Sequence, residues 1–156
     1  MMDITALVHA VQDAKAADAF GADLETQHWT TLQPYLARLV LRAGALLIRQ
    51  GDGDRCAYLL EQGNLQVFVS GAPPGRQRIA VLRPGALVGE ATLFAAVPRS
   101  ANVEAMTPCV VWALAAARFE ELCARSPPLA LPVMRAAGAV MAVRMHDNLV
   151  RGLPLI

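Results

Sequence analysis

Hydrophobic positions recur along this chain with two different spacings, and the spacings divide it into three regions. Apolar residues follow a helical repeat near the N-terminus and again from residue 115 onward. Between these regions, short apolar runs are separated by glycine, proline or aspartate about every 8–12 residues. The pattern predicts a β-rich middle flanked by helices.

Two helices are predicted ahead of the strands. Asp3–Phe20 is rich in alanine and places Leu7 and Val11 on one face. A second, shorter helix is predicted over Asp23–Gln33, where Pro34 stops it.

The middle region contains seven apolar runs that are typical of strands in an all-β sandwich or barrel. They are Leu36–Leu41, Leu46–Ile48, Ala57–Leu60, Leu65–Val69, Ile79–Leu82, Ala101–Ala105 and Val110–Leu114.

Helical spacing returns after the last of these runs. Ala115–Arg125 is predicted to be one helix, and Ser126-Pro127 provides an N-cap and a first-turn proline for another. This last helix is expected to reach about Val150, with Pro132 and Gly138 bending or interrupting it. The chain then divides into residues 1–34, 35–114 and 115–156, which together form one domain.

Composition makes the chain apolar, with 55% hydrophobic and 17% charged residues. Leu129–Met145 is the longest apolar region, but Pro132, Arg135 and Arg144 interrupt it, so no membrane insertion is expected. The N-terminus does not resemble a secretion signal, and a cytoplasmic location is expected. The net charge is +1 with dispersed basic residues, which argues against a nucleic-acid partner.

Residues that bind metals or act as nucleophiles do not cluster, so no metal, cofactor or catalytic residue is expected. The three cysteines are far apart and the three histidines fall in separate predicted helices: Cys56, Cys109, Cys123, His9, His28 and His146. No histidine lies between Leu36 and Leu114, whereas a metal-dependent jelly-roll enzyme would need several there.

The stretch from Val88 to Ala101 carries the most specific chemistry. Gly89 permits a backbone turn with positive φ, and Arg99 supplies a planar, permanently charged fork that matches a phosphate diester. Glu90 has the wrong sign for phosphate, and sugar hydroxyls are its natural target. Together these residues describe a nucleotide whose ribose and phosphate lie side by side.

This stretch, residues 88–101, resembles the phosphate-binding cassette of the cyclic nucleotide-binding domains, in which Gly-Glu precedes Pro-Arg-Ser/Thr-Ala. The resemblance extends over about two-thirds of the chain, through Arg42-Ala43-Gly44, Gln50-Gly51-Asp52, Tyr58–Gly63, Leu82–Gly85 and Val103–Leu122. It implies an eight-stranded antiparallel jelly-roll β-barrel with N-terminal helices, a short phosphate-binding helix and C-terminal lid helices. Val88, Ala91 and Ala96 depart from the family pattern of an aromatic, a larger aliphatic residue and a glycine, which bears on pocket shape and affinity.

The resemblance also implies roles for individual residues. Arg99 would hold the exocyclic phosphate oxygens, and Glu90 would accept a hydrogen bond from the ribose 2′-hydroxyl. Ala91, Thr92 and Ala101 would contribute backbone N–H groups, and Ser100 could reach the base. Gly89 would form part of the pocket wall, together with four apolar residues that ordinary core packing explains equally well: Val81, Leu87, Val88 and Val103. Removing the Arg99 side chain is expected to weaken nucleotide binding and to leave the stability of the ligand-free protein nearly unchanged.

The predicted function is that of a non-enzymatic sensor that binds cAMP or cGMP and repositions its C-terminal helices. Those helices would contact a protein partner or a second copy of the chain, and Arg135 or Arg144 could cap the ligand. Three alternatives stay open: a ligand-free structural or interaction module of the same fold, a cupin-like jelly-roll enzyme, and a transcriptional regulator. The last is disfavoured because no helix-turn-helix domain is expected to follow.

Overall fold

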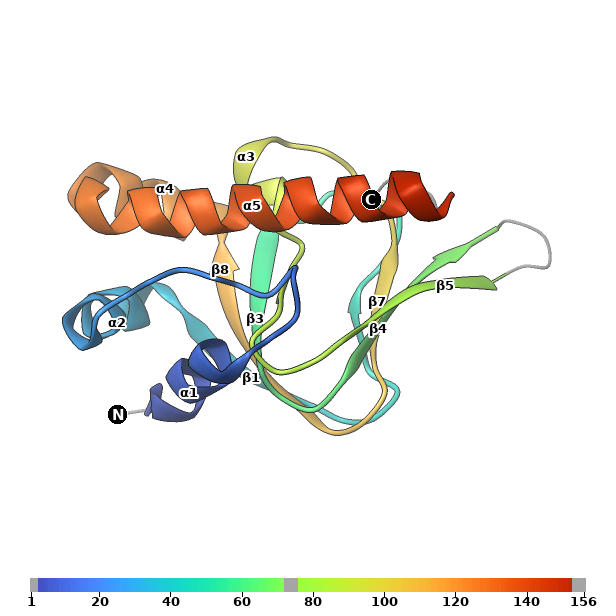
Figure 1. Ribbon diagram of the computed structural model, residues 1–156, viewed down its shortest axis with the longest axis horizontal. Helices are drawn as coiled ribbons and strands as arrows, with labels where there is room; N and C mark the ends of the chain where they lie inside the picture. Colours follow the sequence, from blue (N-terminus) through green and yellow to red (C-terminus); the bar gives the residue numbers. More distant parts are fainter. Residues whose placement is uncertain (1–2, 72–75, 153–156) are drawn as a thin grey trace.

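The computed structural model describes residues 3–71 and 76–152, and within them eight strands form two four-stranded antiparallel sheets (Figure 1). One sheet has the order β1-β8-β3-β6 and the other β2-β7-β4-β5. The strands are β1 (Ala37–Leu41), β2 (Leu46–Ile48), β3 (Cys56–Gln62), β4 (Leu65–Ser70), β5 (Arg76–Leu82), β6 (Leu87–Val88), β7 (Asn102–Ala105) and β8 (Cys109–Ala115). The predicted fold class, a jelly roll with flanking helices, is confirmed.

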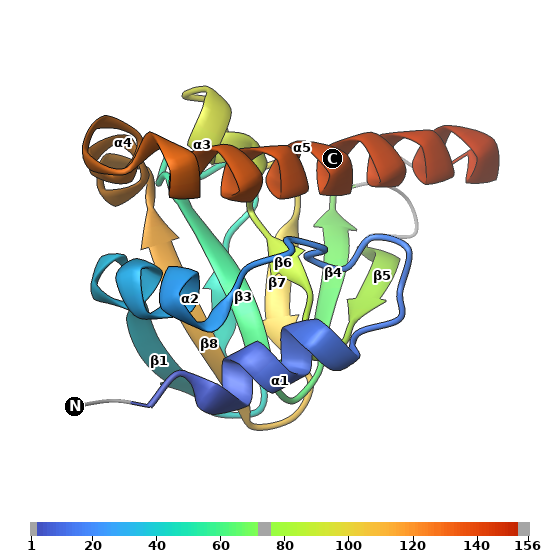
Figure 2. The ribbon, with the colours of Figure 1, turned by 60° about the vertical axis from the view of Figure 1, so that its left-hand side comes forward.

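Helices precede, interrupt and follow the roll. They are α1 (Thr5–Asp13), α2 (Thr26–Leu32), the 3-10 turn η1 (Gln33–Tyr35), the single-turn α3 (Ala91–Phe94), α4 (Ala116–Arg125) and α5 (Pro127–Arg151). Figure 2 shows α1 and α2 in front of the sheet that contains β1, β8 and β3, while α5 lies across one end of the roll. The helices therefore cover one sheet and one open end.

Successive side chains of the sheet β1-β8-β3-β6 point to opposite faces and pack into two separate hydrophobic cores. On β8, Val111 and Cys109 face the roll interior, where they pack with residues such as Leu65. Trp112 and Leu114 face the opposite way, into the cluster formed with the helices. One sheet thus joins the roll to the helical layer.

The first helix is shorter than the sequence predicts, because it ends at Asp13 instead of Phe20. Beyond it the chain is extended at Ala14 and returns to the roll, where the Phe20 N–H donates to the Gly85 carbonyl at 3.0 Å. Phe20 is buried in the helical cluster. Burial of this aromatic ring and backbone pairing outweigh the helical preference of the alanines that precede it.

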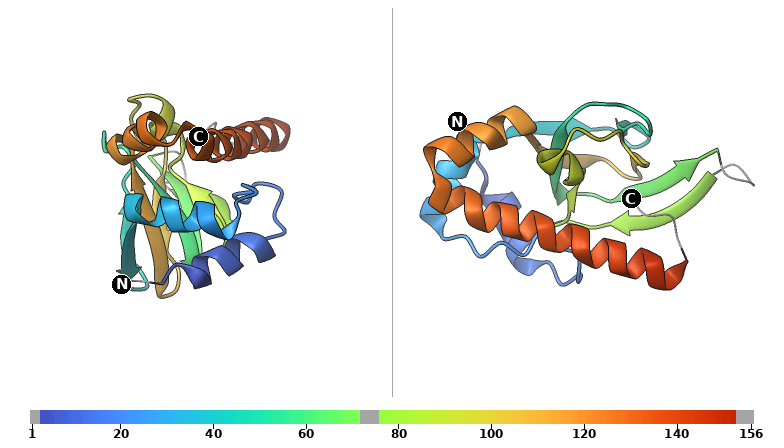
Figure 3. Two further views of the ribbon diagram at one scale, coloured as in Figure 1. Left: turned by 90° about the vertical axis from the view of Figure 1, so that its left-hand side faces the viewer. Right: turned by 90° about the horizontal axis from the view of Figure 1, so that it is seen from above.

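The last helix runs without interruption through Pro132 and Gly138 for 25 residues (Figure 3, right). Its inner face is buried and apolar from Leu129 to Val140, while Leu131 and Leu149 lie on the exposed side. By length and apolar content alone this helix could cross a membrane. In the structure, its inner face packs against the rest of the protein.

Candidate functional site

A cavity of about 140 Å³ opens between the β-roll, α3 and the C-terminal half of α5. Its lining includes every residue predicted to bind ligand: Gly89, Glu90, Ala91, Thr92, Arg99, Ser100 and Ala101. Figure 3 (right) shows α5 running alongside α3 when the molecule is seen from above. The fold therefore brings the predicted site residues together beneath a helix.

Gly89, at the beginning of the cassette, stands at a position where only glycine fits. Its φ is +78°, and a Cβ on it would lie 2.7 Å from Arg99 Nη1 and 2.8 Å from the Cys56 carbonyl oxygen. Both the backbone conformation and the space thus require glycine. The benefit is that the Gly89 carbonyl comes within reach of the Arg99 guanidinium.

Arg99 is almost fully buried, with 5% of its surface exposed. Nε and Nη2 donate to the Asp54 carboxylate at 3.1 and 2.7 Å, and Nη2 also donates to the Cys56 carbonyl at 2.6 Å. Nη1 donates to the Gly89 carbonyl at 3.2 Å and to Thr92 Oγ1 at 3.4 Å. All five N–H donors of the guanidinium are thereby engaged, so an anion at Arg99 would have to replace one of these acceptors.

Asp54 is a partner of Arg99 that sequence reasoning missed. Hydrogen bonds from Arg99 hold the pKa of the Asp54 carboxyl below its ordinary value. Its side chain is 46% exposed, so it keeps contact with water while it balances part of the arginine charge. The two residues are 45 positions apart and neither lies in a regular repeat, so no periodic signal linked them.

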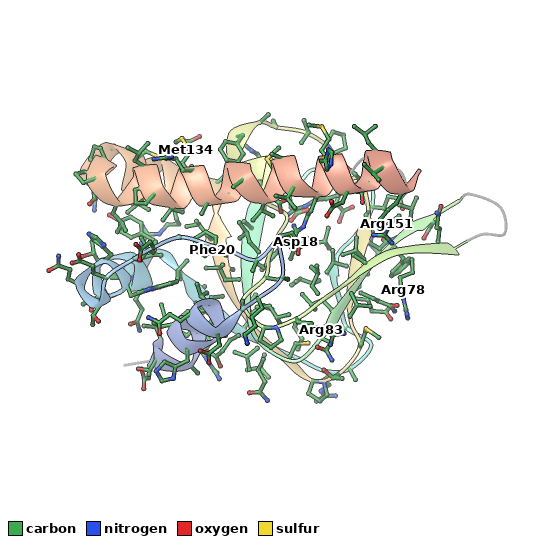
Figure 4. All side chains as sticks on the ribbon, viewed as in Figure 1. Asp18, Phe20, Arg78, Arg83, Met134 and Arg151 are labelled. Atoms are coloured by element: carbon green, nitrogen blue, oxygen red, sulfur yellow. The ribbon has the colours of Figure 1, made fainter. Side chains whose placement is uncertain are left out.

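Glu90 is buried on the cavity wall and pairs with α5. Arg144 Nη1 lies 3.1 Å from each oxygen of the Glu90 carboxylate. Arg144 Nε donates to Asp18 Oδ2 at 2.9 Å, so one guanidinium connects the cassette, α5 and the segment after α1. Figure 4 shows Asp18 directly below α5. The shorter α1 explains this contact, because a helix continuing to Phe20 would not return Asp18 to the site.

Two of the four predicted wall residues lie on the cavity and two do not. Val88 and Val103 line it, whereas Val81 and Leu87 do not. Leu87 points into the helical cluster. Val81 lies between Ala80 and Leu82, which do line the cavity, and successive strand side chains point to opposite faces.

The C-terminal half of α5 supplies polar lining that sequence reasoning largely missed. Arg144 was a weak candidate for a ligand cap, and Asn148, Asp147 and Arg151 line the cavity beside it. Arg135, the other candidate, is exposed. The sequence contains a pattern that could have predicted this lining. Buried apolar residues recur at helical spacing from Leu129, and Arg144 and Asn148 continue that stripe.

Backbone donors surround the same cavity. Thr92 donates its hydroxyl to the Gly89 carbonyl at 2.9 Å, so this side chain supports the turn instead of facing solvent. The Thr92 N–H, which was predicted to face the ligand, instead donates to the Gly89 carbonyl at 3.4 Å. The N–H groups of Ala91, Ser100 and Ala101 donate to no other residue in the described part of the chain. Unpaired N–H groups beside a buried arginine suit an anion.

Metal-binding groups and nucleophiles near the site can be described from the structure. Among residues 3–71 and 76–152, no three His, Cys, Asp or Glu side chains are grouped so that they could hold a metal ion. Cys56 is the thiol nearest the Arg99 network, and burial raises its pKa above the ordinary value. Burial, with the neighbouring Cys56, also raises the pKa of Tyr58 to about 12. Neither group is activated as a nucleophile at neutral pH.

Comparison with known proteins gives concordant results. A family model described as the cyclic nucleotide-binding domain matches residues 38–126. A cAMP-dependent protein kinase regulatory subunit of Blastocladiella emersonii is 31% identical over 100 residues, which are 64% of this chain and 25% of that protein. A cyclic nucleotide-gated potassium channel of Mesorhizobium japonicum is 38% identical over 89 residues, which are 56% of this chain and 23% of that protein. The chain therefore matches about a quarter of the length of these relatives.

A solved structure shares the whole architecture. The crystal structure of a cyclic nucleotide-binding domain from Methylobacillus flagellatus has a TM-score of 0.82 at 22% sequence identity, covering 95% of this chain and 81% of that one. This similarity shows that the fold is shared.

Proposed function

Because this chain belongs to the cyclic nucleotide-binding domain family, we propose that it is a sensor that binds cAMP or cGMP and repositions α5 on binding. The observation that carries the proposal is the placement of Arg99 and Glu90 on one cavity beneath α5. Arg99 would exchange one of its present acceptors for the cyclic phosphate, to which the unpaired N–H groups would also donate. Glu90 would accept a hydrogen bond from the ribose 2′-hydroxyl. We propose no catalytic activity, cofactor or nucleic-acid partner for the chain, and a cytoplasmic location remains a prediction.

Arg144 does not prevent Glu90 from taking this role. A carboxylate offers about four lone-pair positions, and Arg144 Nη1 approaches both Glu90 oxygens from one side. A ribose hydroxyl can therefore donate to Glu90 while the ion pair persists. In that arrangement Glu90 would connect the bound sugar to α5 and, through Arg144, to Asp18.

Calorimetric titration of the protein with cAMP and cGMP tests the binding proposal. Glu90→Gln removes the charge and keeps the shape, and hydrogen bonds to charged groups contribute about 1.5–3 kcal/mol. We expect a loss of affinity of about tenfold to over a hundredfold. Glu120→Gln, at an exposed position of α4, is the control and should bind as the parent does. Equal affinity in Glu90→Gln, or no binding of either nucleotide to the parent, would contradict the proposal.

Movement of α5 needs a separate measurement. A ligand shifts a conformational equilibrium only through its different affinity for the two states, and α5 forms one wall of the cavity. Hydrogen exchange should therefore slow in residues 129–149 as well as in residues 89–100 when nucleotide is added. Protection confined to residues 89–100 would show binding without movement of the helix.

We propose that another protein chain contacts the outer face of α5 and responds to the position of this helix. It carries exposed Leu131, Met145 and Leu149, with Gly138 between them and open space around that glycine. Such a stripe on a helix suits another protein chain, either a partner or a second copy.

The ion pair between Arg144 and Glu90 favours one alternative function, a ligand-free interaction module. Arg144 already occupies the Glu90 carboxylate, so the buried charge is satisfied without a nucleotide. The titration above separates the two functions, because an interaction module would bind neither cAMP nor cGMP.

A further inference from the structure

Two buried hydrogen-bond donors on α5 have no acceptor. They are Arg144 Nη2 and Asn148 Nδ2, and each is shielded from solvent within the described residues without a hydrogen-bond partner. Both residues line the cavity, and Asn148 is only 5% exposed. Since they are four positions apart on one helix, the two side chains are neighbours on the same face.

Such donors are rarely left unpaired in native proteins. A buried donor without an acceptor costs about 1–3 kcal/mol, and the large majority of buried polar atoms are satisfied. The other nitrogens of Arg144 are already fixed, Nε by Asp18 and Nη1 by Glu90. The side chain therefore cannot turn Nη2 elsewhere without breaking a buried ion pair. A ligand that offers acceptors to this face of α5 would remove the cost.

We propose that Arg144 and Asn148 select a purine with an oxygen at position 6, so that guanine-type cyclic nucleotides bind more tightly than cAMP. This proposal rests on the proposed function, in which the phosphate lies at Arg99 and the ribose at Glu90. Because Arg144 contacts Glu90 directly, a base attached to that ribose lies next to Arg144 and, one helical turn further, Asn148.

The chemistry of the two bases determines the preference. Guanine presents two acceptors side by side, N7 and O6, whereas adenine presents N7 and an amino group that donates. The Asn148 amide can rotate to offer its oxygen, but a guanidinium has five donors and no acceptor. An adenine amino group facing Arg144 would therefore meet another donor, and a 6-oxo group would not.

The side chains that β5 and β7 contribute to the lining do not distinguish the two bases. Ile79, Leu82 and Val103 line the cavity there, and all three are buried and apolar. They can cover the flat faces of either purine equally well. Discrimination therefore falls to the polar edge of the base and to α5.

Competition titrations with cAMP, cGMP and cIMP test the proposal. Inosine has O6 and N7 but lacks the 2-amino group of guanine, so cIMP isolates position 6 from contacts such as that of Ser100. We expect the parent to bind cIMP and cGMP at least about fivefold more tightly than cAMP, since one unpaired donor costs about 1 kcal/mol or more.

Variants at Asn148 separate selection from structural support. Asn148→Asp replaces the donor by an acceptor and should shift the cIMP-to-cAMP affinity ratio toward cAMP by about tenfold or more. A merely structural role would weaken both nucleotides alike and leave the ratio unchanged, which would contradict the proposal. His146→Ala, at an exposed neighbouring position, is the control and should leave the ratio unaltered.

The outcomes also distinguish this proposal from the proposed function. If all three nucleotides bind and cAMP is the tightest, the selectivity proposal is overturned and the sensor function stands. If none of the three binds, both are overturned.

Discussion

Replacing Arg99 by alanine should destabilise the ligand-free protein, in addition to weakening nucleotide binding. The sequence alone leads to the opposite expectation, because there Arg99 is only a ligand-facing group. The structure changes this, since the guanidinium is buried and donates five hydrogen bonds, which go to Asp54, Cys56, Gly89 and Thr92.

The magnitude follows from what each partner loses. Asp54 is 46% exposed, so water can replace the arginine and this ion pair contributes little. The Gly89 carbonyl keeps the hydrogen bond from the Thr92 hydroxyl. The Cys56 carbonyl loses a charged donor, and an unsatisfied buried acceptor costs about 1–3 kcal/mol. At about 2–4 °C per kcal/mol for a protein of this size, Tm should fall by between about 2 and 12 °C.

Thermal unfolding followed by circular dichroism, without nucleotide, measures this effect. Arg42→Ala is the matched control, because Arg42 is exposed in the turn between β1 and β2 and its loss should change stability by no more than about 0.5 kcal/mol. If Arg99→Ala melts within about 1 °C of the parent and the control, the buried network does not stabilise the fold and the reasoning is refuted.

Four further results are expected. Because folding lowers the pKa of Asp54, its contribution to stability is complete above the ordinary carboxyl pKa and is lost as the pH falls through the lower pKa of the folded protein. Acid unfolding of Asp54→Asn should lack this pH dependence. Superimposable unfolding profiles of the variant and the parent would argue against the prediction. Gly89→Ala should lower the free energy of unfolding by more than the roughly 1–2 kcal/mol that a positive φ costs a residue with a side chain, because the new Cβ would meet two atoms within 2.8 Å. The control is Gly44→Ala, which has φ +87° and open space around it and should show the conformational cost alone. Ser100→Ala should change the cGMP-to-cAMP affinity ratio by no more than about tenfold in titrations, since a neutral hydrogen bond contributes about 0.5–1.5 kcal/mol. If a second copy covers the outer face of α5, Met145→Glu should lower the mass measured by light scattering, and a parent that is monomeric at all concentrations would exclude that contact.

The architecture could be predicted well because it depends on local patterns. Alternating apolar runs and turn residues predict most of the strands within a residue or two, and Ser126-Pro127 predicts where α5 begins. The short strand Leu87–Val88 produces no run of its own. The end of α1 was predicted wrongly because the backbone pairing of Phe20 with Gly85 depends on a segment 65 residues away.

The candidate site could also be predicted only where its residues are close together in the sequence. The cassette from Gly89 to Ala101 could be identified because its residues are adjacent in sequence and their chemistry is specific. Asp18 and Asn148, which line the cavity, and Asp54, which pairs with Arg99, could not, because each lies in a different segment of the chain. Their roles depend on how distant segments pack, and no spacing within the chain encodes that.

The pairing of Arg144 with Asp18 also has a consequence for the order in which the protein is made. These residues are 126 positions apart, whereas the side-chain hydrogen bonds of Arg99 all go to partners between Asp54 and Thr92. During synthesis from the N-terminus, the part of the cavity around Arg99, where we propose that the phosphate binds, can form once the strands around it have emerged. Its cover must wait for the final helix. A nucleotide present at that time would meet an uncovered half-site first. Binding during synthesis would then depend on the phosphate and sugar alone, and discrimination between bases would arise only when α5 docks.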